Sequence, residues 1–269
     1  MKKKSMFYQT LIITLTMALS LASTCAVAEE IEIVGTGDGT QVLKAVGVAF
    51  GEAYPGVTVA VPRSIGSGGG IKAVGEGQHK IGRVARPIKE REEPFGLTYK
   101  PFAKVPVVFI THPGTGVTNL TAKQICAIYS GEVTNWREVG GNDERIRVVR
   151  REDGDSSLEV LIKTFPGFKD IVITDKSKTA LKTVENFSIV EGKEGTIGFG
   201  PYDVAKDANV KIVQIDGKSP AESGYPSFTT LALVYKAENK SGTLGKFIDF
   251  ATSSSANAAI SSANGIPVN

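Results

Sequence analysis

The sequence has little of the chemistry that most metal sites and cysteine-dependent enzymes use. Among 269 residues it holds two cysteines, Cys25 and Cys126, and two histidines, His79 and His112. Neither histidine lies in a recognisable nucleophile motif, and so few Cys and His side chains argue against a zinc site. We therefore expect no metal and no cofactor.

Nucleotide-binding and hydrolase motifs are also missing. No glycine-rich turn is followed by Gly-Lys-Ser/Thr, which argues against a P-loop. The Gly-x-Ser-x-Gly nucleophile elbow is absent from the sequence as well. The turn at 35–40 lacks the third glycine of a dinucleotide fingerprint, because Thr40 stands at that position.

The N-terminus has the pattern of a secretory signal peptide. Three lysines at 2–4 precede a mostly apolar run at 11–21, and small residues at 26–28 offer a cleavage site. The apolar run is short for a membrane span. We expect residues 1–28 to be a cleaved signal peptide and the protein to be periplasmic. A lipid anchor on Cys25 is the alternative.

The charge balance gives no sign of a nucleic-acid partner. The full chain has 31 Lys and Arg against 28 Asp and Glu. Without the lysines at 2–4 the basic residues also number 28, so the mature chain would be formally neutral. A formally neutral chain has no excess of positive charge that would attract nucleic acids or anionic membranes.

Strand-like and helix-like patterns alternate along the mature chain. The strand candidates are 31–34, 57–61, 105–110, 146–149, 195–200, 210–215 and 229–235. Helical spacing of apolar residues follows several of them and recurs at 244–259. This alternation predicts an α/β fold with largely parallel sheets. Since no break in composition separates two domains, the pattern fits two lobes between which the chain crosses more than once.

Three segments share one design, a strand followed by a turn rich in glycine or hydroxyl groups and then a helix. They are residues 35–40, 64–70 and 150–157. Helix N-termini bind anions because their first N–H groups lack partners, and Arg151 adds a charged, bidentate donor. Hydroxyl donors stand at Thr36, Thr40, Ser67, Ser156 and Ser157. Any one of these loops could equally be a simple helix cap.

The same loops resemble those of the phosphate-binding proteins that serve bacterial ABC transporters. The similar segments are Ser-Ile-Gly-Ser-Gly-Gly-Gly-Ile-Lys at 64–72, the helix and tryptophan turn at 120–136, Val-Val-Arg-Arg-Glu-Asp-Gly at 148–154, Gly-Thr-Ile-Gly-Phe at 195–199 and the strand at 229–236. They follow the same order over most of residues 31–269.

The resemblance implies a fold and a division of the chain. The fold is the two-lobed periplasmic-binding-protein fold of type II, in which each lobe is a mostly parallel sheet flanked by helices, with hinge crossovers. We expect lobe 1 to contain residues 29–106 and 226–269, and lobe 2 to contain residues 107–225. The ligand would lie in the cleft, on which the two lobes close.

The resemblance also implies a function, uptake of a small oxyanion such as phosphate. The protein would be a monomer that delivers its ligand to an ABC-transporter permease. A sensor module for another anion, not coupled to transport, is the first alternative. A phosphatase-like enzyme is the second, since Glu152, Asp153 and Asp155 cluster in one loop.

Residue by residue, the resemblance implies a binding site. Ser67 and Arg151 match ligand-contacting positions. Ser157 stands where the family usually has threonine, and Ser156 stands at a glycine whose backbone N–H contributes. The first-loop contacts would come from Thr36, Gly39 and Thr40.

Two positions depart from the family pattern. Ala85 stands near the place of a buried aspartate that accepts the proton of hydrogen phosphate, with Arg86 beside it, and Asp155 replaces a serine. In a first interpretation Arg86 pairs with Asp155 and the pocket stays positive. In a second, Arg86 contacts the ligand and Asp155 accepts its proton. In a third, Arg86 lies at the surface and Asp155 only caps a helix.

Overall fold

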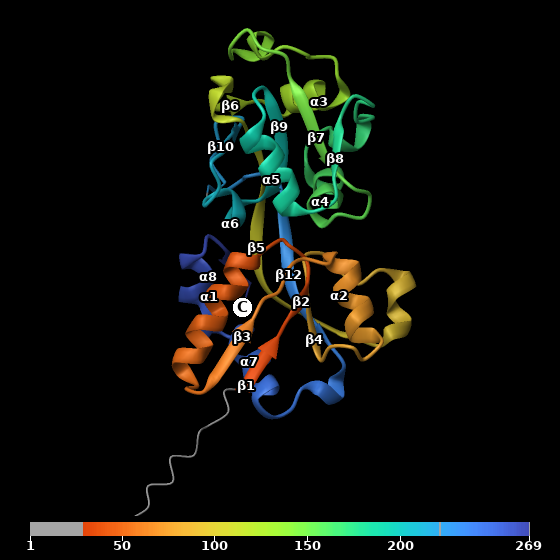
Figure 1. The fold of residues 1–269 in the computed structure, drawn as a ribbon, viewed down its shortest axis with the longest axis vertical. Coiled ribbons are helices and arrows are strands. Elements are labelled where there is room, and N and C mark those ends of the chain that lie inside the picture. Colours follow the sequence, from red (N-terminus) through yellow and green to blue (C-terminus); the bar gives the residue numbers. More distant parts are fainter. Residues whose placement is uncertain (1–28, 221, 269) are drawn as a thin grey trace, which may run out of the picture.

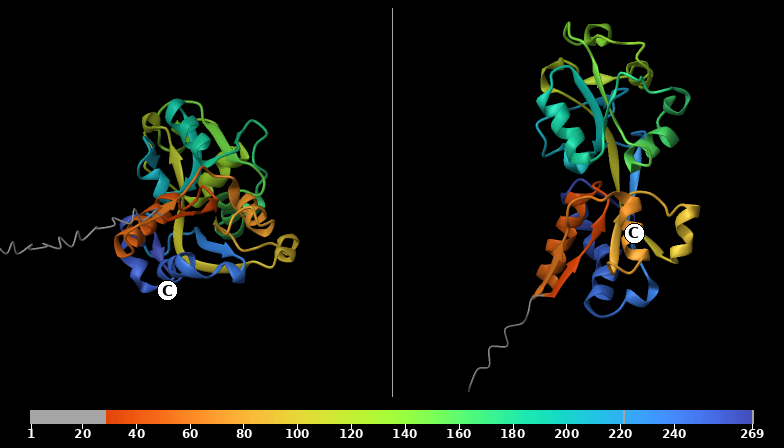
Figure 2. Two further views of the ribbon diagram at one scale, coloured as in Figure 1. Left: turned by 60° about the horizontal axis from the view of Figure 1, so that its bottom comes forward. Right: turned by 45° about the vertical axis from the view of Figure 1, so that its right-hand side comes forward.

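One long strand, β5 (Thr98–Thr111), runs through both halves of the molecule. It pairs with β12 (Phe228–Tyr235) as far as Pro106 and with β9 (Thr196–Pro201) from Val107 onward. The computed structural model describes residues 29–220 and 222–268, and it shows two lobes stacked along the long axis (Figures 1 and 2). The proposed signal peptide, residues 1–28, lies outside the described residues.

The half that we call lobe 1 is the lower one in Figure 1. Besides its parts of β5 and β12, it contains β1 (Glu29–Glu32), β2 (Val34–Gly35), α1 (Thr40–Ala53), β3 (Val57–Ala60), α2 (Gly66–Gly75), β4 (Ile81–Val84), the 3-10 helix η1 (Glu90–Phe95), α7 (Gly242–Ala251), α8 (Asn257–Ser262) and β13 (Ile266–Pro267).

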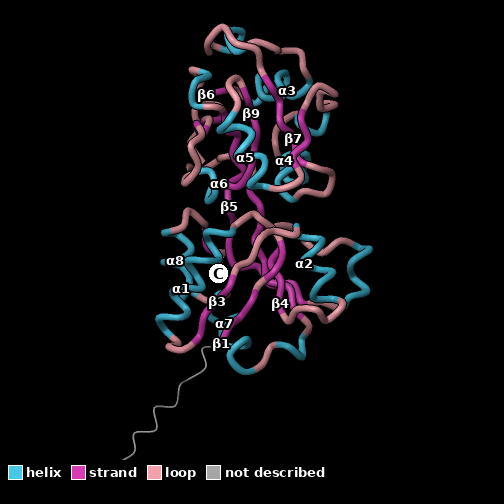
Figure 3. The backbone as a smooth tube through the Cα atoms, viewed as in Figure 1, coloured by secondary structure: helices cyan, strands magenta, loops and turns pink. Residues whose placement is uncertain are grey.

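The upper half of Figure 1 is called lobe 2. Besides β9 and the end of β5, it contains β6 (Asn119–Leu120), α3 (Ala122–Ser130), β7 (Arg147–Arg151), α4 (Ser156–Thr164), β8 (Lys178–Ala180), α5 (Thr183–Gly192), α6 (Tyr202–Ala205), β10 (Lys211–Ile212) and β11 (Gln214–Ile215). Helices lie on the outside of both lobes and strands run between them (Figure 3).

The main sheet has the strand order β2-β4-β12-β5-β9-β7-β8. Toward both edges of this sheet the strands pair parallel: β2 pairs with β4, and β7 pairs with β8 and with β9. Its central strands, β4, β12, β5 and β9, pair antiparallel. The α/β fold is confirmed, but the sheets are mixed and not mostly parallel. The reason is that β5 and β12 carry the chain between the lobes in opposite directions.

Each lobe buries its own apolar core. Phe50, Phe102 and Phe247 belong to the cluster in lobe 1. Phe109 and Phe199 belong to the cluster in lobe 2. Separate cores in the two lobes, joined by strands, allow the lobes to move relative to each other as rigid bodies. The expected division at residues 106 and 226 stays a prediction, and the strand pairing changes at the first of these positions.

The sequence predictions for single helices agree with the structure at α3 and differ from it near the C-terminus. Thr121 is the N-cap of α3, and its side chain accepts a hydrogen bond from the N–H of Gln124. The helical pattern at 244–259 is interrupted, since a 3-10 turn separates α7 from α8. No helix of the part that the structure describes is long and apolar enough to cross a membrane.

Candidate functional site

A cavity of about 250 Å³ lies between the two lobes. Lobe 1 lines it with residues 36–37 and 64–69, and lobe 2 lines it with residues 151–156 and 181–183. All three anion-binding loops expected from the sequence therefore reach one cavity. A helix begins within each of the last three segments: α2 at Gly66, α4 at Ser156 and α5 at Thr183.

A larger hollow of about 570 Å³ lies within lobe 2, lined from β7, β8 and the C-terminal ends of α3 and α5. Lobe 1 contributes nothing to it, and neither Arg151 nor the serines of the three loops line it. We place the functional site in the smaller cavity because both lobes and the charged loop meet there.

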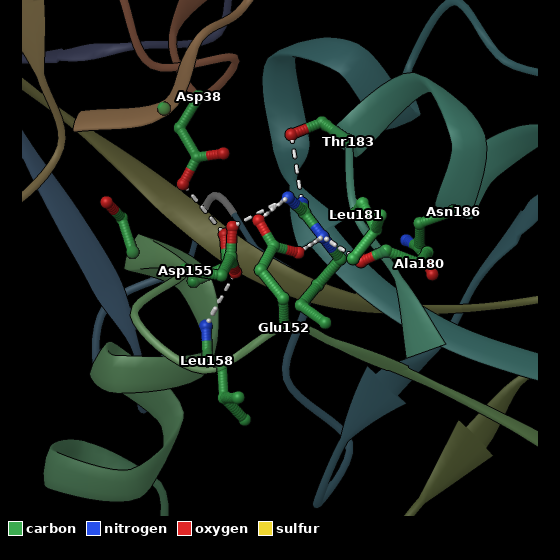
Figure 4. Close-up of polar contacts among 12 residues, drawn as sticks. Asp38, Glu152, Asp155, Leu158, Ala180, Leu181, Thr183 and Asn186 are labelled. Atoms are coloured by element: carbon green, nitrogen blue, oxygen red, sulfur yellow. Dashed lines mark hydrogen bonds and ion pairs between the residues drawn. The ribbon is translucent and has the colours of Figure 1, made fainter. Parts of the chain in front are cut away.

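Arg151 is the central cation of the cavity. It ends β7, and its guanidinium is buried. Nη2 lies 3.0 Å from Oδ2 of Asp155, and Nε and Nη2 each donate to the carboxylate of Glu152 at 3.1 Å. Nη1 donates to Oγ1 of Thr183 at 3.0 Å. Figure 4 shows the carboxylates of Asp38, Glu152 and Asp155 gathered at this point. Protein groups thus occupy most of its donors.

Two serines from opposite lobes meet across the cavity. Oγ of Ser67, in the first turn of α2, lies 2.9 Å from Oγ of Ser156, which begins α4. Ser67 also accepts the backbone N–H of Ala85 at 3.1 Å. The backbone of Ala85 therefore helps to fix the position of the Ser67 hydroxyl. Both serine hydroxyls are buried and placed where an oxyanion could accept from them.

Asp155 caps helix α4. Its Oδ1 accepts the N–H of Leu158 at 3.0 Å, and its other oxygen faces Arg151. Burial and, after it, the negative charge of Asp38 raise the pKa of Asp155, Arg151 lowers it, and the net result is a pKa of about 7. Asp155 therefore caps a helix, as the third interpretation expected. It also forms an ion pair with Arg151, which none of the three interpretations included.

Arg86 does not pair with Asp155. Its Nη1 and Nη2 donate to the two carboxylate oxygens of Glu92, both at 2.7 Å, and only 5% of its side chain is exposed. It is not among the residues that line the cavity. The first interpretation and the surface position of the third are therefore wrong. The sequence did not indicate that Glu92 is the partner of Arg86, because Glu92 lies in the 3-10 helix η1, which has no strong hydrophobic pattern.

The first loop contributes less than expected. Thr36 lines the cavity, whereas Gly39 and Thr40 do not. Gly39 is the N-cap of α1 and has no side chain to cap it, so a residue of lobe 2 does so: the N–H of Gln41 donates to Oδ2 of Asp203 at 3.0 Å. A carboxylate of the protein thus already occupies the start of α1, where an anion was expected.

Asp38 is a site residue that the sequence did not reveal. It is 2% exposed, and its Oδ2 accepts the hydroxyl of Ser157 from the other lobe at 2.8 Å. In the part of the chain that the structure describes, its Oδ1 has no hydrogen-bond partner. Burial raises the pKa of Asp38 to about 6, although Arg151 and Ser157 lower it. Ser157 therefore bonds to Asp38 and does not line the cavity.

Thr183 is a second residue that was missed. It begins α5, accepts from Arg151 and lines the cavity. A Cβ on Gly37 would lie 2.7 Å from its Oγ1, so glycine at 37 lets the lobes come this close. The sequence did indicate a helix start at this position, since threonine at 183 precedes apolar residues at helical spacing.

The charged groups around the cavity include more acids than bases. The guanidinium of Arg151 faces the carboxylates of Asp38, Glu152 and Asp155. Asp38 does not itself line the cavity, whereas Asp153 and Lys182 do. Since carboxylates repel an anion, protonation of Asp38 and Asp155 near neutral pH would favour anion binding. Within residues 29–220 and 222–268, no group of three or more His, Cys, Asp or Glu side chains is arranged to hold a metal ion.

Arg83 stabilises the first loop, residues 35–40, through hydrogen bonds to backbone carbonyls. Its buried guanidinium donates to the carbonyls of Thr36 and Pro62, each at 2.7 Å, and to that of Ile33. Replacing Arg83 with methionine would leave buried carbonyls unsatisfied, each at a cost of about 1–3 kcal/mol. We expect Arg83→Met to lower the melting temperature clearly. Equal melting temperatures for it and for Arg63→Met, which changes an exposed arginine, would contradict this role.

Comparison with known proteins decides the family. A model of the PBP superfamily domain matches residues 22–255. The chain belongs to the PBP superfamily. Two curated relatives are phosphate-binding proteins PstS: the one from Borreliella burgdorferi is 27% identical over 204 residues, covering 70% of this chain and 72% of the relative. The one from Bacillus subtilis is 28% identical over 210 residues, covering 75% and 68%.

Solved structures of this superfamily agree with the fold. A putative phosphate ABC transporter substrate-binding protein with bound phosphate from Clostridium perfringens is 32% identical, with a TM-score of 0.80, and the match covers 90% of this chain and all of the other. An ABC-type phosphate transport receptor from Vibrio cholerae is 25% identical, with a TM-score of 0.63, over 89% of this chain and all of the other. The resemblance to phosphate-binding proteins and the two-lobed fold of this superfamily are confirmed.

Proposed function

We propose that this protein is an extracytoplasmic solute-binding protein that captures a small oxyanion, phosphate first, for uptake by an ABC transporter. The observation that carries the proposal is the buried guanidinium of Arg151 in a cavity lined by both lobes. Relatives named as phosphate-binding proteins support phosphate as the ligand.

The ligand contacts come from both lobes. Ser67 and Thr36 belong to lobe 1, and Arg151 and Ser156 belong to lobe 2, so an anion that touches all four holds the lobes together. Bidentate contact with Arg151 requires the protein to release one edge of the guanidinium: either Glu152 leaves Nε and Nη2, or Thr183 and Asp155 leave Nη1 and Nη2. The ligand thus competes with a carboxylate of the protein.

The remaining parts of the proposal concern the setting of the protein. It would be exported through a signal peptide at residues 1–28, act as a monomer, present closed lobes to a permease and carry out no catalytic turnover. Transport is favoured over sensing because the Clostridium perfringens and Vibrio cholerae relatives are named as transporter components.

A melting-temperature screen tests the ligand. Phosphate at about 100 times its dissociation constant should stabilise the fold by about 2.7 kcal/mol, which for a chain of this size is a shift of about 5–10 °C. Arsenate, sulfate, molybdate and tungstate complete the panel. A shift with a different anion would correct the ligand, and no shift with any of the five would contradict the oxyanion proposal.

A further inference from the structure

An ion cluster outside the cavity also joins the lobes. In lobe 1, Arg86 and Glu92 form a bidentate pair, and the backbone N–H of Lys89 donates to Oε2 of Glu92 at 2.9 Å. The side chains of Arg86 and Glu92 are 5% and 9% exposed, so this pair is fixed in the body of lobe 1. Arg86 therefore carries a rigid, buried positive charge.

Glu159 of lobe 2 reaches this cluster from helix α4. Its Oε1 accepts a hydrogen bond from Nζ of Lys89, and its Oε2 lies 4.0 Å from Nε of Arg86. Among the described residues, no group accepts a hydrogen bond from that Nε. The side chain of Glu159 is 19% exposed and that of Lys89 31% exposed, so these charges are partly removed from water.

The charges of the cluster balance only when the lobes are together. Arg86 and Lys89 are two cations against the single carboxylate of Glu92, and Glu159 supplies the missing negative charge. Ser156, which meets Ser67 across the cavity, begins the helix that carries Glu159. Because one rigid helix carries both residues, closure over the ligand and approach of Glu159 to Lys89 are parts of one movement.

We infer that Glu159 and the Arg86–Lys89–Glu92 cluster form a latch that stabilises the closed arrangement of the lobes. Glu159 is a positioning residue, since it contacts the other lobe and does not line the cavity. The consequence for ligand release rests on the proposed function, whereas the effect on the closed form does not. The latch also gives a role to Arg86, which follows Ala85 at a departure from the family pattern.

Glu159→Gln removes the charge and keeps the shape of the side chain. Small-angle scattering of the ligand-free protein should give a larger radius of gyration for this variant than for the wild type. Stopped-flow measurements with phosphate should show faster dissociation, by about fivefold or more, with association unchanged. Glu132→Gln is the matched control, because it removes an exposed carboxylate of lobe 2 beyond the end of α3.

Lys89→Gln tests the same contact from lobe 1. The latch predicts that Lys89→Gln and Glu159→Gln are not additive, because either change alone breaks the pair. A radius of gyration for Glu159→Gln and Lys89→Gln equal to that of the control would overturn the latch. If the wild type fails to bind phosphate, the proposed function fails, and the scattering comparison still decides whether the latch exists.

Discussion

Arg151→Ala is expected to weaken phosphate binding by at least about 100-fold. Each hydrogen bond to a charged group contributes about 1.5–3 kcal/mol, and the guanidinium can offer two to one anion. The loss has a second part, because Glu152 and Asp155 would remain beside the ligand without the cation that balances them. Titration calorimetry at fixed pH and salt concentration measures the change.

Two variants separate charge from geometry at this position. Arg151→Lys keeps the positive charge but loses the planar fork, so its affinity should lie between those of the wild type and Arg151→Ala. Arg150→Ala is the control, since Arg150 pairs with exposed Asp153 and does not line the cavity. Wild-type affinity in Arg151→Ala would show that the anion binds elsewhere.

The affinity for phosphate should depend on the ionisation of Asp155. The pKa of Asp155 is raised to about 7 in the protein, mainly by burial, and a bound anion raises it further. Binding of the anion is therefore coupled to proton uptake, and affinity falls as the pH rises above 7. Asp155→Asn keeps the helix cap but has no charge to lose. Its affinity should fall less steeply, by a difference in slope of about one proton.

Calorimetric dissociation constants between pH 6 and pH 8.5 test this expectation. The ionisation of phosphate itself affects all variants equally, so the comparison between variants isolates the protein. Asp143→Asn serves as the control, because its carboxylate is an exposed one of lobe 2 that does not line the cavity. Parallel pH profiles for the wild type and Asp155→Asn would contradict the proposed charge balance.

The same carboxylates affect the stability of the ligand-free protein. The pKa values of Asp38 and Asp155 are raised from 3.8 to about 6 and about 7. The folded state therefore holds protons that the unfolded state releases, and stability falls as the pH rises from about 4 to about 7. Above that range both states are ionised and the loss is complete. This direction is the opposite of that for a carboxylate stabilised by an ion pair.

Local patterns were enough to predict much of the fold and part of the site. The N-cap of α3, the strand β12 and the loops that carry Ser67 and Arg151 follow from residue type and spacing within a few positions. Such features depend on neighbours in the chain. They are therefore visible in a single sequence.

Contacts between distant segments could not be predicted in this way. Asp203 caps α1 from 162 residues away, and Asp38 meets Ser157 across 119 residues. The pairing of Arg86 with Glu92 lies close in the chain, but nothing in the sequence indicates that both side chains are buried. Of these residues, Asp38 contributes to the charge around Arg151, so that charge balance emerges only from the folded chain.

An anomalous difference map of crystals grown with arsenate tests the central claim most directly. Arsenic locates the anion without ambiguity, and arsenate has the shape and charge of phosphate. We expect one peak in the cavity between the lobes, with arsenate oxygens within hydrogen-bond distance of Arg151 and Ser67. An empty cavity, or a peak only in the larger hollow of lobe 2, would contradict the proposed site.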